Sequence, residues 1–307
     1  MTKQEMGALV VIGNFDGVHR GHRALLEGAE REALKKGLDP TLLTFFPHPA
    51  TVLGRVPPPL LTTQPRKREL VREIAPRVRF HEQTFDLAFA AQTPDAFARR
   101  LAEELGTKAV IVGQNFRFGK GRAGGFDDLV ALGKTYGFEA HSESLHGDAK
   151  GRWSSTRARE AISRGDLADA SETLGRPHML SGRVVHGKKL GRTIGFPTCN
   201  LGEVPEMLPP LGVYAARVDR VNDGVAHPLA GGALSIGVNP TTDATNDVKV
   251  EVFLLDFDQD LYGAELRLHI VERIRGEEKF DGIDALKRQI SADVHEVRRV
   301  LSAAKKL

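Results

Sequence analysis

The sequence predicts two domains of different architecture: a doubly wound parallel α/β sheet, followed by an antiparallel β-barrel that ends in a helix. Three observations support this prediction. The first half alternates short apolar runs with helical patterns, the second half separates apolar runs by turn residues, and the C-terminal segment returns to a helical pattern. The length of 307 residues is sufficient for two domains of about 150 residues each.

The first half opens with a βαβ pattern. Strands are predicted over residues 8–12 and 41–46, and a helix over 22–36, which Gly37 closes. A further helix is predicted to begin at Thr93, because the sequence Thr-Pro-Asp is typical of helix N-termini, and the strand 109–112 follows it. Since strands alternate with helices, we expect the sheet to be parallel.

The second half is expected to form the barrel. Apolar strands are predicted at 184–185, 213–218, 233–238, 248–255 and 266–274, and a terminal helix at 283–304. No long helical pattern interrupts these strands, and such regular spacing is typical of antiparallel barrels. The segment Arg176–His178 marks the boundary, which gives domains of residues 1–178 and 179–307.

Composition and charge narrow the class of protein. The hydrophobic fraction of 41% and the charged fraction of 27% are ordinary for globular proteins, and no apolar run is long enough to span a membrane. Residues 1–5 mix acidic and basic side chains, so we expect no signal peptide and a cytoplasmic location. The single cysteine excludes an intramolecular disulfide. Small anionic substrates explain the net charge of +3 as well as RNA would; we expect small-molecule substrates, no nucleic acid, no membrane and at most a weak homo-oligomer.

A glycine-containing loop follows the first strand. It consists of Gly13, Asn14, Phe15, Asp16 and Gly17. Glycines let backbone N–H groups approach an anion at the N-terminus of the next helix, and the spacing fits neither the dinucleotide fingerprint nor the P-loop. That helix begins with His19 and His22, which share one side of a helical turn. We expect both imidazoles to face the phosphates of ATP; a pair of surface histidines and a zinc site are the alternatives.

Three further segments are expected to converge on this loop. They are Thr44–Pro49 at the end of a strand, Gly113–Gly125 after the next buried strand, and Ser154–Arg159 at a helix start. Their candidate binding residues are His48 in the first, Asn115, Arg117 and Phe118 in the second, and Ser155, Thr156 and Arg159 in the third, where Arg157 adds a second arginine. Aromatic rings stack on flat ligands, and arginines and hydroxyls bind phosphates. Taken alone, these segments are a proline turn, a flexible surface loop and a helix cap.

A second basic, glycine-rich stretch covers residues 182–200. Its candidate residues are Gly187, Lys188, Gly191, Arg192, Gly195, Pro197, Thr198 and Asn200, and Arg273 on a later strand is added to them. Thr198 and Asn200 can share one face of a strand, and their oxygens suit magnesium that bridges nucleotide phosphates. Cys199 then points to the opposite face and packs in the core. Without further context, the stretch is a barrel hairpin.

The motifs GNFDGVHRGH, TFFPHP, NFRFG and SSTRAR, in this order, resemble the FAD synthetase module of the prokaryotic bifunctional riboflavin kinase/FAD synthetase family. The motifs GRVVHG, GRTIGFPTCN, GVY, IGVNPTT, VEVFLLDF and LYG resemble the riboflavin kinase module of the same family. The resemblance implies a Rossmann-like HxGH nucleotidyltransferase domain that adenylylates FMN to FAD and releases pyrophosphate. It also implies a barrel domain that phosphorylates riboflavin to FMN, with ATP as co-substrate and magnesium as the cofactor of both reactions.

The resemblance further implies roles for single residues. His19 and His22 bind the ATP phosphates, the Asn115 loop holds substrate, and Ser155, Thr156 and Arg159 complete the nucleotide site. In the barrel, Thr198 and Asn200 bind the ATP–magnesium complex, and Glu251 is the base that takes the proton from the ribityl hydroxyl. A carboxylate on the otherwise apolar strand of Glu251 is costly to bury without a task or partner, although an outward, solvated glutamate is the alternative.

The chain departs from the family pattern at four positions. Many relatives have an acidic residue at Phe46, a histidine at Phe253, an asparagine at Ser235 and a bulky aliphatic residue at Ala158. We expect these departures to bear on affinity and rate rather than on the type of reaction. Two rival hypotheses are a different HxGH transferase, acting on pantetheine phosphate or glycerol phosphate, and a flavin- or RNA-binding protein that has lost catalysis. The kinase-like second half argues against the first of these.

Overall fold

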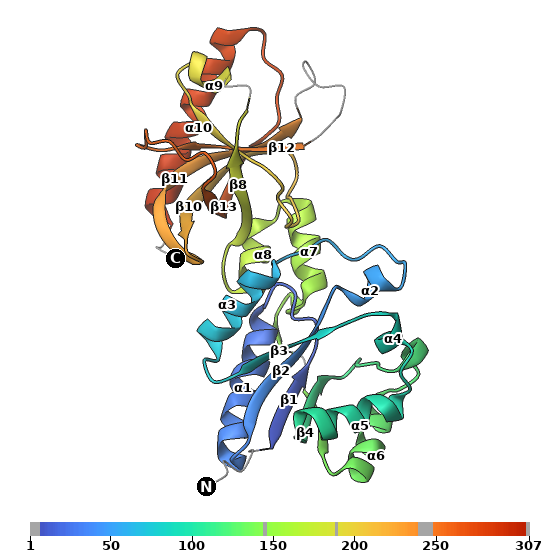
Figure 1. Cartoon of the computed structure of the whole chain (residues 1–307). Coiled ribbons are helices and arrows are strands. Elements are labelled where there is room, and N and C mark those ends of the chain that lie inside the picture. The colour runs from blue at the N-terminus through green and yellow to red at the C-terminus, as the bar shows by residue number, and fades with distance from the viewer. Residues whose placement is uncertain (1–6, 144–145, 188–189, 239–247, 305–307) are drawn as a thin grey trace. The chain divides into compact units, whose positions relative to one another are not determined.

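The computed structural model describes residues 7–143, 146–187, 190–238 and 248–304 (Figure 1). The chain divides into two compact units. One consists of Met1–Pro58 and Thr62–Ser154, and the other of Pro59–Leu61 and Ser155–Leu307. Each unit has its own fold and its own hydrophobic core.

The first unit is built on a five-stranded sheet in the order β3-β2-β1-β4-β5, and all neighbouring strands are parallel. The strands are β1 (Ala8–Ile12), β2 (Asp39–Phe46), β3 (Arg79–Thr84), β4 (Thr107–Gly113) and β5 (Glu139–Glu143). Because β1 pairs with both β2 and β4, the strand order reverses at β1, and open α/β sheets bind ligands at such a switch point. The predicted parallel sheet is confirmed.

Helices cover both faces of this sheet (Figure 1). They are α1 (Arg20–Lys36), α2 (Pro49–Val52), α3 (Gln64–Ile74), α4 (Leu87–Ala90), α5 (Pro94–Leu105) and α6 (Phe126–Tyr136), with a short 3₁₀ turn, η1 (Lys120–Arg122). Side chains of β1 alternate between the faces: Leu9 and Val11 pack with α1 and α3, whereas Val10 and Ile12 pack with α5 and α6. The unit also contains a small hairpin of β6 (Gly147–Asp148) and β7 (Gly151–Arg152).

The predicted helix boundaries hold within a few residues because they depend on local caps. Thr93 caps α5, since its Oγ1 accepts a hydrogen bond from Ala96 N at 3.1 Å. Helix α1 ends at Gly37, which has φ 65° and closes the helix in the left-handed conformation, as expected. Helix α1 begins at Arg20, two residues before the predicted start.

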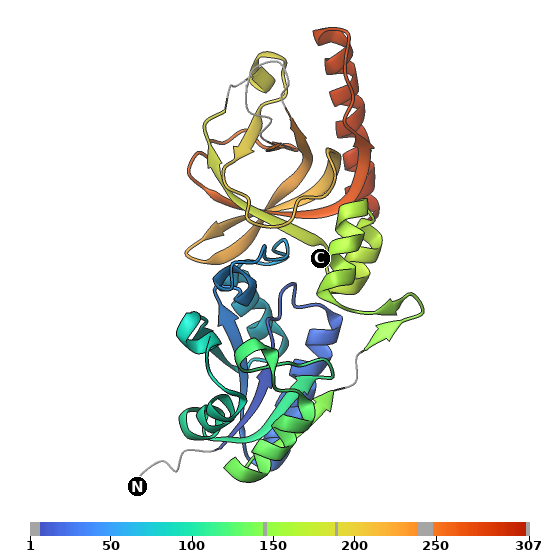
Figure 2. The ribbon, with the colours of Figure 1, turned by 90° about the vertical axis from the view of Figure 1, so that its right-hand side faces the viewer.

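The second unit contains a closed antiparallel barrel (Figure 2). Its strand order is β10-β11-β12-β9-β8-β13. The strands are β8 (His178–Val185), β9 (Thr198–Leu201), β10 (Gly212–Asn222), β11 (Val225–Val238), β12 (Val248–Leu254) and β13 (Glu265–Gly276). Alternate residues of β12, namely Val250, Val252 and Leu254, point into the barrel core, so the outer face of this strand carries Glu251 and Phe253. The predicted antiparallel barrel is confirmed.

The helices of the second unit are α7 (Ser155–Arg164), α8 (Leu167–Leu174), α9 (Leu190–Thr193) and α10 (Ile283–Ala303). Helices α7 and α8 pack on each other and on Leu61, and Leu167 of α8 belongs to the barrel core cluster. Val297 and Val300 of α10 pack on Ala215 of β10, which confirms the predicted terminal helix. In the part of the chain that the structure describes, we find no helix with the length and apolarity that crossing a membrane would require.

Candidate active sites

The loop between β1 and α1 is the centre of the candidate site in the first unit. Its backbone is in the left-handed region at Phe15 (φ 51°), Gly17 (φ 82°) and Val18 (φ 39°). Glycine adopts positive φ without cost, but phenylalanine and valine do not. The side chains of Phe15 and Val18 are buried in the core formed with α1 and α3, and this packing helps to hold the loop in its shape.

The two histidines lie together at the start of α1. His19 is the N-cap residue, and its Nδ1 accepts a hydrogen bond from His22 N at 3.2 Å, so the neutral ring carries its proton on Nε2. The rings of His19 and His22 stack with centroids 3.6 Å apart, and His22 also stacks on Phe15 at 4.4 Å. A Cβ at Gly21 would come within 3.1 Å of the His19 ring and of the Trp153 carbonyl oxygen. The prediction that both histidines lie on one side of the first turn is confirmed.

Asp16 anchors the loop from inside. Its Oδ1 accepts hydrogen bonds from Thr62 N (3.1 Å) and from Thr62 Oγ1 (3.3 Å), and the same hydroxyl accepts one from Gly17 N (3.0 Å). The Asp16 side chain is buried. These bonds give the carboxylate a structural role, and the assignment of Asp16 as a nucleotide contact stays a prediction.

The end of β2 lies beside this loop, as predicted. His48 Nε2 is 3.2 Å from Asn14 Nδ2, and His48 Nδ1 accepts a hydrogen bond from Ala50 N at 3.1 Å, which caps α2. Phe46, one of the departures from the family pattern, is 50% exposed at the same strand end. The side chains that follow β1 and β2 therefore meet at the carboxyl edge of the sheet.

The loop after β4 lies at the same sheet edge, and its three candidate residues differ in exposure. Asn115 and Arg117 are exposed, but Phe118 is buried and packs on Phe97 and Phe116 with ring centroids 5.4 Å and 5.5 Å away. Backbone hydrogen bonds between Phe118 and Gly124 close the loop on itself. The Phe118 ring is thus part of the core; its predicted contact with ligand stays a prediction.

Ser155, Thr156 and Arg159 lie at the start of α7, in the other compact unit from the histidines. Arg159 Nε donates a hydrogen bond to the Pro59 carbonyl oxygen at 2.7 Å. Arg157 donates two hydrogen bonds to the carboxylate of Asp169 on α8, from Nη2 at 2.7 Å and from Nε at 3.2 Å. The second arginine of this motif therefore holds α7 against α8.

Lys67 of α3 contacts the glycine loop, and the sequence analysis does not single it out. The side chain is 4% exposed, and its Nζ donates a hydrogen bond to the Asn14 carbonyl oxygen at 2.8 Å. Burial lowers the pKa of Lys67, while the carboxylates of Asp16 and Glu82 oppose that shift. One signal was available in the sequence: Lys67 precedes the buried Leu70 and Val71 by three and four residues, so a lysine occupies the apolar stripe of a helix.

The second site lies on the outer face of the barrel, where β9 pairs with β12. Asn200 is opposite Glu251 and Thr198 is opposite Phe253, and Thr198 Oγ1 donates a hydrogen bond to Glu251 Oε2 at 3.3 Å. Cys199, between them, packs against the barrel core, and burial raises the pKa of its thiol. The predicted alternation of these side chains is confirmed. Glu251 is half-buried and hydrogen-bonded rather than fully solvated.

Two of the candidate glycines, Gly187 and Gly191, let the loop backbone lie directly against residues at and beside β9. A Cβ at Gly187 would overlap the Asn200 amide, and a Cβ at Gly191 would overlap the Phe196 carbonyl and come within 3.4 Å of Thr198 Oγ1. Gly195 has φ 91°, and Arg192 and Pro197 are exposed. Lys188 and the Asn-Pro-Thr-Thr part of the IGVNPTT motif lie outside the described residues.

The structure does not bring Arg273 to this cluster. Its strand β13 pairs with β8 and β10, not with β9 or β12, and Arg273 Nη2 donates a hydrogen bond to the Leu211 carbonyl at 2.9 Å. Its nucleotide contact stays a prediction. The other departures from the family pattern are placed as follows: Ser235 lies opposite Glu251, Phe253 packs edge-on against Phe196, and Ala158 is buried beside Leu61.

Metal chemistry at these sites is limited by the available donors. Within the described ranges, no group of three or more His, Cys, Asp and Glu side chains could hold a metal ion. The oxygens of Thr198 and Asn200 are hard donors on one face of β9, which fits magnesium because this ion takes few protein ligands and keeps several waters.

The fold and the histidine-bearing loop of the first unit define an HxGH nucleotidyltransferase domain, and the second unit adds a closed barrel. A family model described as FAD synthetase matches residues 1–157, and one described as riboflavin kinase matches residues 174–301. With the full-length relatives described next, these matches show that the chain belongs to the family of bifunctional riboflavin kinase/FMN adenylyltransferases.

Relatives of this name match nearly the whole chain. The enzyme of Escherichia coli K12 is 41% identical over 295 residues, which cover 94% of this chain and 90% of the relative. The enzyme of Bacillus subtilis is 35% identical over 315 residues, covering 100% and 96%. A crystal structure from Streptococcus pneumoniae, described as a macrolide-efflux protein, superposes with a TM-score of 0.79 at 32% identity and covers 95% of this chain and 94% of that chain.

Proposed function

We propose that the first unit carries out the adenylyl transfer of this family and the second the phosphorylation. In the first reaction, a phosphate oxygen of FMN attacks the α-phosphorus of ATP and pyrophosphate leaves. In the second, the ribityl hydroxyl of riboflavin attacks the γ-phosphorus, ADP leaves, and the hydroxyl proton passes to a base. The observation that carries this proposal is that each unit has its own cluster of suitable groups: two stacked imidazoles in one, and a hydrogen-bonded Thr198–Glu251 pair in the other.

In the adenylyltransferase, His19 and His22 steady the ATP phosphates. His19 Nδ1 is used as a helix cap, so its Nε2–H is the ring donor for a phosphate oxygen. The positive end of α1 and the backbone N–H groups of the glycine loop favour negative charge at the same place. Asn115, Arg117 and His48 act as further ligand contacts. For Ser155, Thr156 and Arg159, which belong to the other unit, the nucleotide contact that the family resemblance implies stays a prediction. Catalysis is then mainly positioning and electrostatic stabilisation.

In the kinase, Glu251 takes the proton and the neighbouring residues hold the nucleotide. Thr198 Oγ1 donates to Glu251, which fixes the carboxylate and leaves Thr198 and Asn200 on the same face as the base. The oxygens of Thr198 and Asn200 would hold the magnesium of ATP, and the ion would supply positive charge that neutralises the phosphates. The glycines at 187 and 191 bring the loop backbone close to this face, and Gly195 supplies the positive φ of the turn between them and Thr198.

The proposal also covers the domain boundaries, the cellular location and the partners of the protein. We assign residues 1–178 to the adenylyltransferase and 179–307 to the kinase; two such domains are supported by one family model that ends at residue 157 and another that begins at residue 174. We also propose a cytoplasmic enzyme with a possible weak homo-oligomer. It acts on small molecules rather than nucleic acid, which the near balance of 43 basic and 40 acidic residues supports.

One incubation tests the proposal. Purified protein is mixed with riboflavin, ATP and magnesium, and the flavins are separated by chromatography. We expect FMN and then FAD; FMN alone would show that the first unit is inactive. Neither product would overturn the assignment and favour a flavin-binding protein without catalysis. Substituting pantetheine phosphate or glycerol phosphate for FMN tests the rival transferase hypothesis.

A further inference from the structure

The carbonyl group of Asn14 in the glycine loop is held by two buried donors. Lys67 Nζ donates to its oxygen at 2.8 Å, and Thr44 Oγ1 donates to it at 3.2 Å. Lys67 is 4% exposed and Thr44 is fully buried. The carbonyl is therefore fixed toward the side of the loop on which α3 and β2 lie.

This orientation determines where the next backbone N–H points. In a trans peptide, the carbonyl and the following N–H point in opposite directions. The Phe15 N–H is consequently directed away from Lys67 and Thr44, and it donates to no other group among the described residues. A backbone N–H that projects from a glycine loop at a helix N-terminus is a donor of the kind that phosphate oxygens use.

The loop would relax if these two donors were lost. Phe15 has φ 51°, a left-handed conformation that is unfavourable for a phenylalanine. A half-turn of the Asn14–Phe15 peptide changes φ of Phe15 toward the negative region and so relieves this strain. The same rotation turns the Asn14 carbonyl oxygen outward, where it would repel a phosphate. Lys67 and Thr44 oppose that rotation.

Burying a lysine to hold a carbonyl group costs free energy, because its ammonium group loses water. Lys67 is 4% exposed, so its charge is poorly solvated; this burial lowers the pKa of Lys67, and the carboxylates of Asp16 on the loop and Glu82 on β3 oppose that shift. Glu82 is itself shared with Arg68, at 3.2 Å. An apolar side chain in this stripe of α3 would pack beside Leu70 and Val71 without that cost. The benefit of a lysine therefore lies in the loop rather than in the stability of the helix.

We propose that Lys67 is a positioning residue for adenylyl transfer: with Thr44, it fixes the Asn14–Phe15 peptide so that the Phe15 N–H faces the ATP phosphates. This inference rests on the proposed ATP site of the first unit. It assigns to α3 and β2 a part in nucleotide binding without any direct contact with the nucleotide.

The test compares Lys67→Met, Thr44→Val and the double variant in the full chain. FAD formation is measured from supplied FMN at varied ATP, and FMN formation from riboflavin is measured on the same preparation. We expect each single variant to raise the KM for ATP in FAD formation, by about tenfold for Lys67→Met, the value of one hydrogen bond to a charged group. The double variant should cost less than the product of the two single effects, because one peptide is released only once. FMN formation should not change.

Matched variants separate positioning from general damage. Lys36→Met removes an exposed lysine of α1, and Thr41→Val changes another buried threonine of β2; both should keep the parent KM. The melting temperature of Lys67→Met should equal or exceed that of the parent, because a buried ammonium is removed, whereas a lysine that served only the fold would lower it. If Lys67→Met does not fold, Thr44→Val decides, and an unchanged KM for ATP overturns the proposal.

A structural readout keeps the inference distinct from the proposed function. If the parent makes no FAD, the proposed function fails. Crystal structures of the parent and of Lys67→Met still show whether the Asn14 carbonyl turns outward when the lysine is lost. An unchanged carbonyl in the variant overturns the inference, whatever the activities are.

Discussion

Thr198 Oγ1 donates a hydrogen bond to Glu251 Oε2 at 3.3 Å across the β9–β12 pair, so the two side chains act as one polar group on the outer face of the barrel. The bond orients the carboxylate and leaves its other oxygen to accept a proton. A glutamate in this place, half-buried on a strand whose neighbours point inward, is suited to act as a general base.

Glu251→Gln should abolish most FMN formation. The amide keeps the shape and a hydrogen-bond acceptor for Thr198 but cannot take a proton, so we expect the rate to fall by about a hundredfold or more. FAD formation from supplied FMN should remain, because the histidine site lies in the other unit. Glu265→Gln, at an exposed position of β13, is the matched control and should leave both activities unchanged. A Glu251→Gln enzyme with normal FMN formation would remove the base from this mechanism.

Substitutions at the histidine pair should have the reverse effect. His19→Asn keeps a side-chain acceptor that can cap α1 but removes the ring donor, and His22→Ala removes the second ring. Each should lower FAD formation by about a hundredfold, as loss of one preorganised donor does, with FMN formation unchanged. His141→Asn on β5 is the control. If His19→Asn kept full activity, the cap rather than the ring would be the reason for a histidine at this position.

The fold could be predicted where the spacing of apolar residues, a turn residue or a helix cap determines the local structure. The strand 8–12 and strands β10, β12 and β13 follow from apolar runs and turn residues, whereas the predicted runs cover only the end of β8 and of β11. Thr93 and Gly37 set helix ends through their own hydrogen bonds and φ. The packing of α8 was not predictable in this way. Leu167 joins the barrel core although its helix precedes the barrel in sequence, and tertiary contact alone determines that.

In the candidate sites, too, some features follow from local sequence patterns and others depend on tertiary contacts. The shared face of Thr198 and Asn200 follows from the two-residue period of a strand, and the pairing of His19 with His22 follows from a helical turn. The burial of Phe118, whose contact with ligand stays a prediction, depends on Phe97 of α5, and the sequence of its own loop does not show that contact. The role of Lys67 depends on a carbonyl group, which no side-chain pattern reports.

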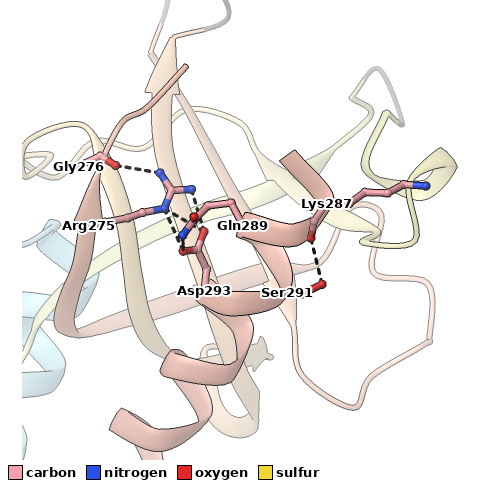
Figure 3. A network of polar contacts seen from close by, with 6 residues as sticks. All are labelled: Arg275, Gly276, Lys287, Gln289, Ser291 and Asp293. Atoms are coloured by element: carbon pink, nitrogen blue, oxygen red, sulfur yellow. Dashed lines mark hydrogen bonds and ion pairs between the residues drawn. The ribbon is translucent and has the colours of Figure 1, made fainter. Parts of the chain in front are cut away.

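A buried ion pair ties the terminal helix to the barrel. Arg275 of β13 binds Asp293 of α10 through Nε and Nη2, at 2.8–3.1 Å, and Gln289 donates to the same carboxylate at 2.9 Å (Figure 3). The Asp293 side chain is 5% exposed. Asp293→Ala leaves the guanidinium without its partner and should lower the free energy of unfolding by about 3 kcal/mol, measured by calorimetry of the full chain.

The same helix offers a matched control for this prediction. Arg298 of α10 binds Asp256 through two hydrogen bonds, at 2.6 and 2.7 Å, but Asp256 is 74% exposed. Arg298→Ala should therefore leave the melting temperature unchanged, because exposed ion pairs contribute little and alanine suits the helix at this position. Equal destabilisation by the two variants would show that burial is not what gives the Arg275–Asp293 pair its strength.

Glu206 should make the stability of the second unit depend on pH. The side chain is 3% exposed; Ser181 Oγ donates to Oε1 at 2.6 Å and Ser181 N donates to Oε2 at 3.0 Å. Burial raises the pKa of Glu206 above its ordinary value of 4.5, and the bonds from Ser181 and the charge of Arg267 reduce that rise. The native state thus keeps its proton at a pH where the unfolded state has lost it. The free energy of unfolding should fall as the pH rises from 4.5 through the raised pKa.

Two variants test the sign of this dependence. Glu206→Gln has no proton to lose at this position, so its stability relative to the parent should grow with pH across that window and then level off. Ser181→Ala removes a hydrogen bond that favours the carboxylate, which raises the pKa of Glu206 further, so the decline in stability should extend to higher pH. Denaturant unfolding at a series of pH values measures all three proteins. Parallel curves for the parent and Glu206→Gln would mean that Glu206 has the same pKa in the folded and unfolded chains, and that its burial is compensated in full by Ser181 and Arg267.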